Sequence, residues 1–253
     1  MAEHGRYLYA VCRDLDVEEL DGLLGLEDAI VDGVEAEGLV GLVSSVDLDE
    51  YGEEGLRRNL ESLDWLETAA RGHDAVVQAA AALAPTAPMR LATVFRDDEG
   101  VRRRLVEQHD PISRVLDRIE GHEEWSVKVL TRSARDLGAD GATPATSGTE
   151  YLRQRKNEQE AREAGARDAH ATAERVHDAL VRVAVASRRL PPQDPRLTGH
   201  TGTMVHNAAY LVPRGESDEF NAVVSDMSAA HSEVRIDARG PWPPYSFAML
   251  DDQ

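Results

Sequence analysis

Three residues in this sequence occupy positions where a side chain could do chemistry. His73 lies on the apolar stripe of an expected helix, Arg90 lies in the stretch PMRLAT, and Lys128 lies inside an expected strand with an apolar opposite face. A buried lysine with a lowered pKa can be catalytic, and an arginine can hold an anion. Each position also has a structural explanation: a lysine extending from a sheet edge or paired with a carboxylate, an arginine bridging elements, and a core or interface histidine. We favour the structural explanation for all three.

Motifs of the common catalytic and cofactor-binding classes are absent. The sequence has no Walker loop, no glycine-rich dinucleotide turn, no Gly-x-Ser-x-Gly elbow and no HExxH helix. His170 and His177 share a helix face but lie seven residues apart, too far for one metal ion. We expect Cys12, the single cysteine, to be a small core residue in the middle of a strand. The residues alone therefore point to no catalytic residue, no cofactor and no metal.

The charge of the chain limits its partners. With 47 acidic and 28 basic residues among 253, the net charge is −19, which argues against nucleic acid and anionic membrane surfaces as partners. Between Asp14 and Glu61 the sequence has sixteen carboxylates and two arginines. This acidic stretch is either a solvated face that favours solubility or a docking face for a basic partner. The lone cysteine and the absence of a recognisable secretory signal favour a cytoplasmic location.

Periodicity and turn residues predict a chain of alternating strands and helices. Strands are expected at 6–12, 88–95, 123–130, 202–213 and 232–240, with a hairpin or two neighbouring strands within 27–46. Helices are expected at 56–83, 97–121, 151–189 and 216–231, the second one broken or kinked at Asp110-Pro111.

These elements predict an α+β protein of two α/β domains. From Glu123 onward the order of strand, long helix, strand, helix and strand is close to a ferredoxin-like domain with one strand missing or unrecognised. We place the N-terminal α/β domain at residues 1–121 and a modified ferredoxin-like domain with a proline/aromatic tail at residues 122–253. The stretch 137–150, rich in Gly, Ala, Ser and Thr, is either a linker or a crossover loop.

The C-terminal stretch GPWPPYSFAML concentrates aromatic residues in a chain that has few. Trp242, Tyr245 and Phe247 fall within six residues, and the whole stretch contains three prolines. Such a composition suits a recognition tail. Because the stretch follows directly on an expected strand, we favour a lid that folds back over a domain surface, at the seam between the two domains. In that arrangement Trp242→Ala would cost about 3–5 kcal/mol, as for a buried aromatic.

Several stretches taken in order resemble one known family over nearly the whole chain. They are GRYLYAV, WLETAARGHDAVV, APMRLATVF, EEWSVKV, EYLRQRK, NAAYLVPR, EFNAVVSDM and GPWPPYSFA. This series is similar to the gas vesicle accessory proteins F and L. One departure stands at Leu91-Ala92-Thr93, where the family usually carries Phe-Gly-Thr. Alanine in place of glycine would disfavour a positive φ or a close backbone approach there.

The resemblance implies a non-enzymatic factor in gas vesicle assembly. Such a protein binds the small hydrophobic shell protein and other accessory proteins, and members have been placed at the gas-facing side of the shell. Partner-binding or structural hallmark positions carried by the matching stretches are Arg90, Thr93, Trp125, Lys128, Tyr210, Trp242, Pro244, Tyr245 and Phe247.

Two other functions stay open at this point. An enzyme on a ferredoxin-like domain would need Lys128, Arg90 and His73 to converge in one pocket. A regulatory module would bind a small ligand at the domain interface, in a deep pocket with convergent polar groups.

Overall fold

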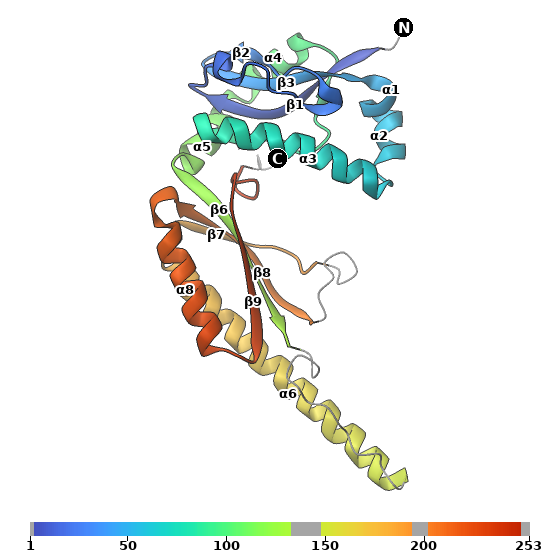
Figure 1. Cartoon of the computed structure of the whole chain (residues 1–253), viewed down its shortest axis with the longest axis vertical. Coiled ribbons are helices and arrows are strands. Elements are labelled where there is room, and N and C mark those ends of the chain that lie inside the picture. The colour runs from blue at the N-terminus through green and yellow to red at the C-terminus, as the bar shows by residue number, and fades with distance from the viewer. Residues whose placement is uncertain (1–2, 133–147, 194–201, 249–253) are drawn as a thin grey trace. The chain divides into compact units, whose positions relative to one another are not determined.

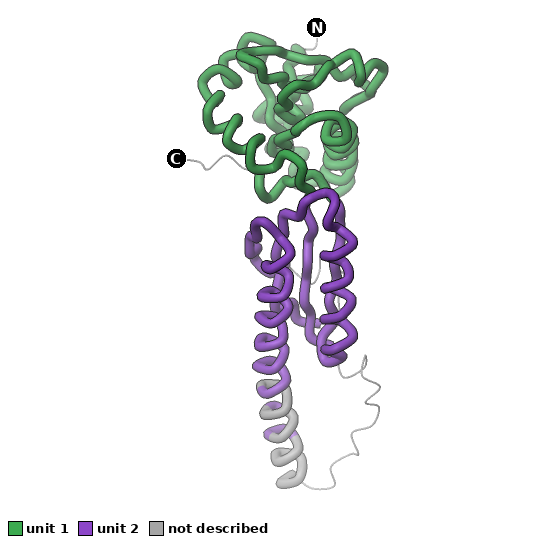
Figure 2. Tube along the Cα trace, turned by 90° about the vertical axis from the view of Figure 1, so that its left-hand side faces the viewer, with its two compact units in different colours: residues 1–123, 242–253 green, residues 124–241 purple. Residues whose placement is uncertain are grey.

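The computed structural model describes residues 3–132, 148–193 and 202–248 (Figure 1). The chain forms two compact units (Figure 2): unit 1 is Met1–Glu123 together with Trp242–Gln253, and unit 2 is Glu124–Pro241. Each unit combines helices with an antiparallel pairing of strands, which confirms the expected α+β class. In the described ranges, no helix is both apolar enough and long enough to span a bilayer.

Unit 1 is built on a sheet with the order β2-β3-β1-β4, in which β5 also pairs with β1. The strands are β1 His4–Arg13, β2 Asp32–Ala36, β3 Leu39–Asp47, β4 Thr86–Pro88 and β5 Val94–Phe95. The expected hairpin is confirmed: β2 and β3 pair antiparallel around a turn at Glu37 and Gly38. Both turn residues have positive φ, 50° and 78°, the conformation that a tight hairpin requires and that glycine adopts without strain.

Helices cover both faces of this sheet. They are α1 Leu48–Tyr51, α2 Glu53–Asn59, α3 Leu63–Leu83, α4 Asp98–Glu107 and α5 His109–Ile119, with two short 3-10 turns at Val17–Leu20 and Leu26–Asp28. Figure 1 shows α3 along one face, where it packs on Tyr7 and Tyr9 of β1. On the other face, Val101 and Leu105 of α4 lie close to Gly41 and Leu8, where a side chain larger than that of glycine at position 41 would meet them.

Two expected elements of unit 1 are wrong in extent. The helix expected over 56–83 is interrupted after Asn59, and α3 begins afresh with Ser62 accepting a hydrogen bond from the Trp65 amide. Leu63, placed on the expected buried stripe, is 72% exposed. The strand expected over 88–95 is divided into β4 and β5, because the backbone turns at Ala92, which has φ +65°.

Unit 2 contains a sheet with the order β7-β8-β6-β9 and two helices on one of its faces. Its elements are β6 His122–Thr131, α6 Gly148–Val181, β7 Ala186–Arg189, β8 Met204–Pro213, the 3-10 turn Arg214–Glu216, α8 Ser217–Ala230 and β9 Val234–Trp242. Its core joins Val127 of β6 and Tyr210 of β8 to Leu180 of α6 and Phe220 of α8.

The helix expected over 151–189 is too long at its C-terminal end. It ends at Val181, and the stretch that follows forms β7, the strand that was unrecognised in the sequence. β7 forms because it pairs with β8, with Ala186 opposite Leu211, and this pairing has no local signal. Most of the expected linker 137–150 lies outside the described residues.

Candidate binding site

A pocket of about 810 Å³ lies beside α3 in unit 1. Its wall is formed by α3, the β4–β5 turn, α4 and the C-terminal tail. The apolar lining residues are Ala70, Pro88, Met89, Leu91, Phe95, Tyr245 and Ala248. The polar ones are Glu67, Arg71, His73, Asp74, Arg90, Thr93 and Arg104. A volume of this size holds several apolar side chains or one small molecule.

The β4–β5 turn is held by backbone and side-chain hydrogen bonds to β1. The Ala92 amide donates to the Tyr7 hydroxyl at 3.0 Å, and the Leu8 amide donates to the Thr93 carbonyl at 2.8 Å. Thr93 also closes the turn, because its hydroxyl donates to the Arg90 carbonyl at 2.7 Å. The positive φ of Ala92 is the conformation that glycine adopts freely, so the alanine at this position is strained.

His73 lies at the floor of the pocket and is 4% exposed. Its Nδ1 lies 3.0 Å from the Tyr7 hydroxyl oxygen. The Tyr7 hydroxyl oxygen also accepts the Ala92 amide, and because a hydroxyl can donate once and accept twice, either tautomer of the neutral ring satisfies this contact. Among the described residues, no hydrogen bond of ordinary geometry reaches Nε2, although the Met89 backbone interacts with the ring.

Burial disfavours the charged form of His73 and lowers its pKa to about 4, although the Asp74 charge and the Met89 backbone act in the opposite direction. His73 is therefore neutral at physiological pH. Burial likewise raises the pKa of the Tyr7 hydroxyl well above its usual range, so Tyr7 stays protonated. The floor of the pocket is uncharged.

The C-terminal tail closes one side of the pocket. The Tyr245 hydroxyl donates to Asp74 Oδ1 at 2.9 Å, and the Arg118 guanidinium donates to the Phe247 carbonyl. Phe247 is buried, and Tyr245 packs against the core of unit 1. The tail thus folds back onto unit 1, whereas the sequence placed it in the C-terminal domain.

Of the residues singled out in the sequence, the pocket brings together His73, Arg90, Thr93 and Tyr245. Pro244 and Phe247 are buried in the same tail without lining the pocket. Trp242 differs from its expected role as a buried lid residue, because it is 42% exposed. The cost expected for Trp242→Ala is therefore too high.

The other three singled-out residues lie in unit 2. Trp125 is buried against Phe220, with ring centroids 5.7 Å apart, and its indole donates to Ser217 at 3.3 Å. Tyr210 is fully buried, and its hydroxyl meets His177 at 2.7 Å and His206 at 3.1 Å. Lys128 lies in β6, half-buried, in a different unit from the pocket that contains Arg90 and His73.

The pocket also contains residues that the sequence did not single out. Met89, Leu91, Phe95 and Arg104 line it, and they come from a turn, a two-residue strand and a helix. Arg104 is the last of three consecutive arginines, 102–104, so no local pattern distinguishes it. Only the tertiary fold brings its side chain to the pocket.

Several polar groups of the lining are engaged with one another. The Thr93 hydroxyl donates to the Arg90 carbonyl. Glu67 pairs with Arg71, and Asp74 accepts from Tyr245. Apolar side chains also line the pocket.

Comparisons with known proteins bear on the whole chain. Residues 5–249 match the family described as gas vesicle synthesis protein GvpL/GvpF. Gas vesicle protein L of Streptomyces sp. (strain CB03234) is 40% identical over 252 residues, covering 98% of this chain and 94% of that protein. Gas vesicle protein F of the same strain is 27% identical over 186 residues, covering 69% and 75%.

The fold has a counterpart among solved structures. The crystal structure of the gas vesicle protein GvpF from Anabaena sp. PCC7120 aligns with a TM-score of 0.71 and 22% identity, covering 98% of both chains. The resemblance found in the sequence is thereby confirmed. The chain belongs to the GvpL/GvpF family of gas vesicle synthesis proteins and takes part in gas vesicle formation.

Proposed function

We propose that this chain is a non-enzymatic assembly factor that binds the small hydrophobic shell protein of the gas vesicle, together with other accessory proteins. The pocket of unit 1 is the docking site for the shell protein. The observation that carries the proposal is the apolar lining of this pocket in a chain of net charge −19. Binding sites in proteins are typically concave and mostly apolar, with a small number of polar groups that fix the orientation of what binds.

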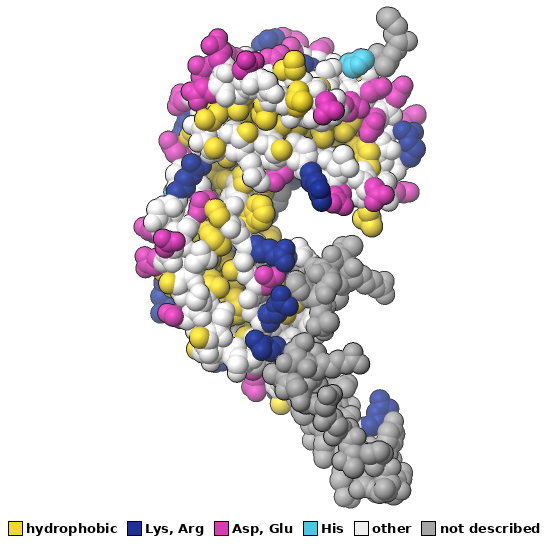
Figure 3. Space-filling view, in the orientation of Figure 1, with side chains coloured by type: hydrophobic (Ala, Val, Ile, Leu, Met, Phe, Trp, Pro, Cys, Tyr) yellow, Lys and Arg dark blue, Asp and Glu magenta, His cyan; other side chains and the backbone are white. Residues whose placement is uncertain are grey.

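The charge of the chain supports the same function. Carboxylates are spread over the visible surface of unit 1 (Figure 3), and the acidic stretch 14–61 belongs to this unit. A strongly acidic surface keeps a protein soluble and separate from like-charged copies. A factor that shields an apolar subunit from aggregation needs both properties.

Several finer features belong to the same proposal. Each compact unit is a domain, and unit 2 is a modified ferredoxin-like domain, supported by its β-α-β-β-α-β order and its strand order β7-β8-β6-β9. The protein acts in the cytoplasm and on the gas vesicle, at the gas-facing side of the shell. The higher identity to protein L than to protein F of one strain favours the L paralogue.

A matched pair of α3 variants tests the docking site. Ala70 is exposed and lines the pocket, whereas Ala75 is exposed on the same helix and does not line it. Ala70→Gln and Ala75→Gln add the same polar side chain, and glutamine is a good helix former, so both variants fold. We expect Ala70→Gln to reduce co-purification of co-expressed shell protein about tenfold, because a polar group then covers apolar contact area, and Ala75→Gln to leave it unchanged. Equal co-purification by both variants would refute docking at the pocket.

A small-ligand module is the second candidate, because the pocket volume of about 810 Å³ falls within the range of small-molecule sites. A thermal-shift screen separates the two functions. A metabolite that stabilises the wild type and not Ala70→Gln favours the ligand module. The assembly factor is favoured when the shell protein alone has this effect.

A further inference from the structure

The two carboxylates of the pocket already have partners. Glu67 forms an ion pair with Arg71 one helical turn away. Asp74 accepts hydrogen bonds from the Tyr245 hydroxyl at 2.9 Å and from the Gln78 amide at 2.6 Å. The pocket therefore offers an incoming ligand little acceptor capacity from carboxylates.

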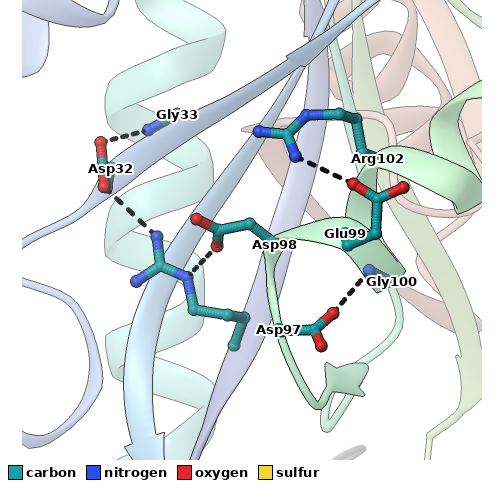
Figure 4. A network of polar contacts seen from close by, with 8 residues as sticks. Asp32, Gly33, Asp97, Asp98, Glu99, Gly100 and Arg102 are labelled. Carbon is teal, nitrogen blue, oxygen red and sulfur yellow. Dashed lines mark hydrogen bonds and ion pairs between the residues drawn. The ribbon is translucent and has the colours of Figure 1, made fainter.

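Arg104, unlike these two carboxylates, is a charged residue of the pocket without an ion-pair partner among the described residues. It is half-buried on α4 and lines the pocket, yet its guanidinium makes no ion pair or side-chain hydrogen bond within the described part of the chain. Two other charged residues of this helix are paired: Arg102 with Glu99 at 3.2 Å (Figure 4), and Asp98 with Arg6 at 2.6 Å. A partly desolvated guanidinium without a counter-ion is unfavourable until a partner supplies one.

His73 at the floor of the pocket does not set the polarity of a ligand. Its Nε2 makes no hydrogen bond of ordinary geometry among the residues described, but the Met89 backbone acts on the ring, and either tautomer fits the contact with Tyr7. Arg104 is therefore the group of the pocket that selects the charge of an incoming segment.

We propose that the pocket takes an apolar segment of its protein partner that carries an Asp or Glu side chain, and that Arg104 pairs with this carboxylate. This inference rests on the proposed function and adds the chemistry of the segment that enters. The lining provides apolar contacts through Met89, Leu91 and Phe95, and Arg104 selects the charge. Because the net charge of the chain repels anions, a carboxylate that enters the pocket needs a nearby positive charge, which Arg104 provides.

The test compares two neighbouring arginines. Arg103 is exposed, follows Arg102 on the same helix and does not line the pocket, so Arg103→Gln changes the net charge as Arg104→Gln does. The probes are fluorescent peptides that tile the shell protein, each made also with Asp and Glu replaced by Asn and Gln, and Kd is measured by anisotropy. We expect one acidic peptide to bind the wild type. Arg104→Gln should raise the Kd of this peptide about tenfold or more, as for the loss of a charge-assisted hydrogen bond. Arg103→Gln should change the Kd less than about twofold.

A charge swap adds a positive signal. Arg104→Glu should lose the acidic peptide and gain the same peptide with its acidic residue changed to Arg. Equal effects of the Arg103 and Arg104 variants, or equal binding of the acidic peptide and its amide version, would overturn the inference. The proposed function still stands in that case if Ala70→Gln lowers binding, and it falls with the inference if Ala70→Gln has no effect.

One further experiment tests whether the residues after Ala248 occupy the pocket themselves. Their sequence, Met-Leu-Asp-Asp-Gln, is both apolar and acidic. A chain that ends at Ala248 should bind the peptide with the Kd of the full chain. Markedly tighter binding by the shortened chain would identify its own C-terminal sequence as the occupant and would refute the assignment of the partner.

Discussion

Acidification should destabilise unit 1 through His73. The ring is neutral when folded because burial lowers its pKa to about 4, whereas an unfolded histidine has a pKa of about 6.5. Between these two values the unfolded chain binds a proton that the folded chain does not. The free energy of unfolding therefore falls as the pH is lowered through this window, and is unaffected above it.

The size of the effect follows from the two pKa values. One group of this kind removes about 2 kcal/mol of stability between pH 7 and pH 5, and about 3 kcal/mol once the pH falls below both values. His73→Gln removes the titration and keeps an acceptor for the Tyr7 hydroxyl. The quantity to follow is the difference in the free energy of unfolding between wild type and this variant.

Urea unfolding at pH 7, 6 and 5, followed by circular dichroism and tryptophan fluorescence, measures this difference. Carboxylates shared by both proteins cancel in the comparison. We expect the advantage of wild type over His73→Gln to shrink by about 2 kcal/mol between pH 7 and pH 5. His170→Gln, at an exposed position of α6, controls for the loss of a histidine. A wild-type advantage that is constant with pH would refute a buried neutral His73.

Three further substitutions test the local structure by urea unfolding. Ala92→Gly should stabilise the protein by about 0.5–1 kcal/mol, because it relieves a left-handed backbone at φ +65°, and a loss of stability would contradict strain there. Tyr245→Phe should cost about 1 kcal/mol by removing the bond to the Asp74 carboxylate, and an unchanged midpoint would show that the tail is held by other contacts. Tyr210→Phe should cost about 1–3 kcal/mol, because buried His206 then loses its hydrogen bond at 3.1 Å, and no change would mean that water replaces the hydroxyl.

Local patterns predicted the regular elements of the fold well. The hairpin of β2 and β3 follows from apolar runs separated by Gly38, and the break between α4 and α5 falls at Gln108, beside the expected Asp110-Pro111. Such signals depend on the chemistry of single residues, which acts over a few positions. They are readable without the tertiary structure.

Elements stabilised by tertiary contacts were missed or misjudged. Leu56 and Leu63 continue a helical spacing across the break at Ser62, so periodicity alone joined α2 and α3 into one helix. The strand β7, Ala186–Arg189, has two arginines and exists because β8 pairs with it. The local sequence does not determine which distant strand a segment pairs with.

The candidate site was predictable only in part. His73 and Arg90 were singled out by residue type and position, and Thr93 and Tyr245 because they belong to stretches that match the family. Arg104 was missed, since its distinguishing property is a half-buried position without a counter-ion. Burial and partners of this kind depend on four separate segments meeting at one pocket.

Photocrosslinking from the mouth of the pocket tests the central claim most directly. A benzoylphenylalanine is placed at Ala70 or, as the control, at Ala75, in cells that make gas vesicles. Both positions are exposed on α3, and Ala70 alone of the two lines the pocket. We predict a crosslink to the shell protein from position 70 and none above background from position 75. Crosslinks of equal yield from both positions, or none from position 70 while the protein remains folded and vesicles form, would contradict docking of the shell protein at this pocket.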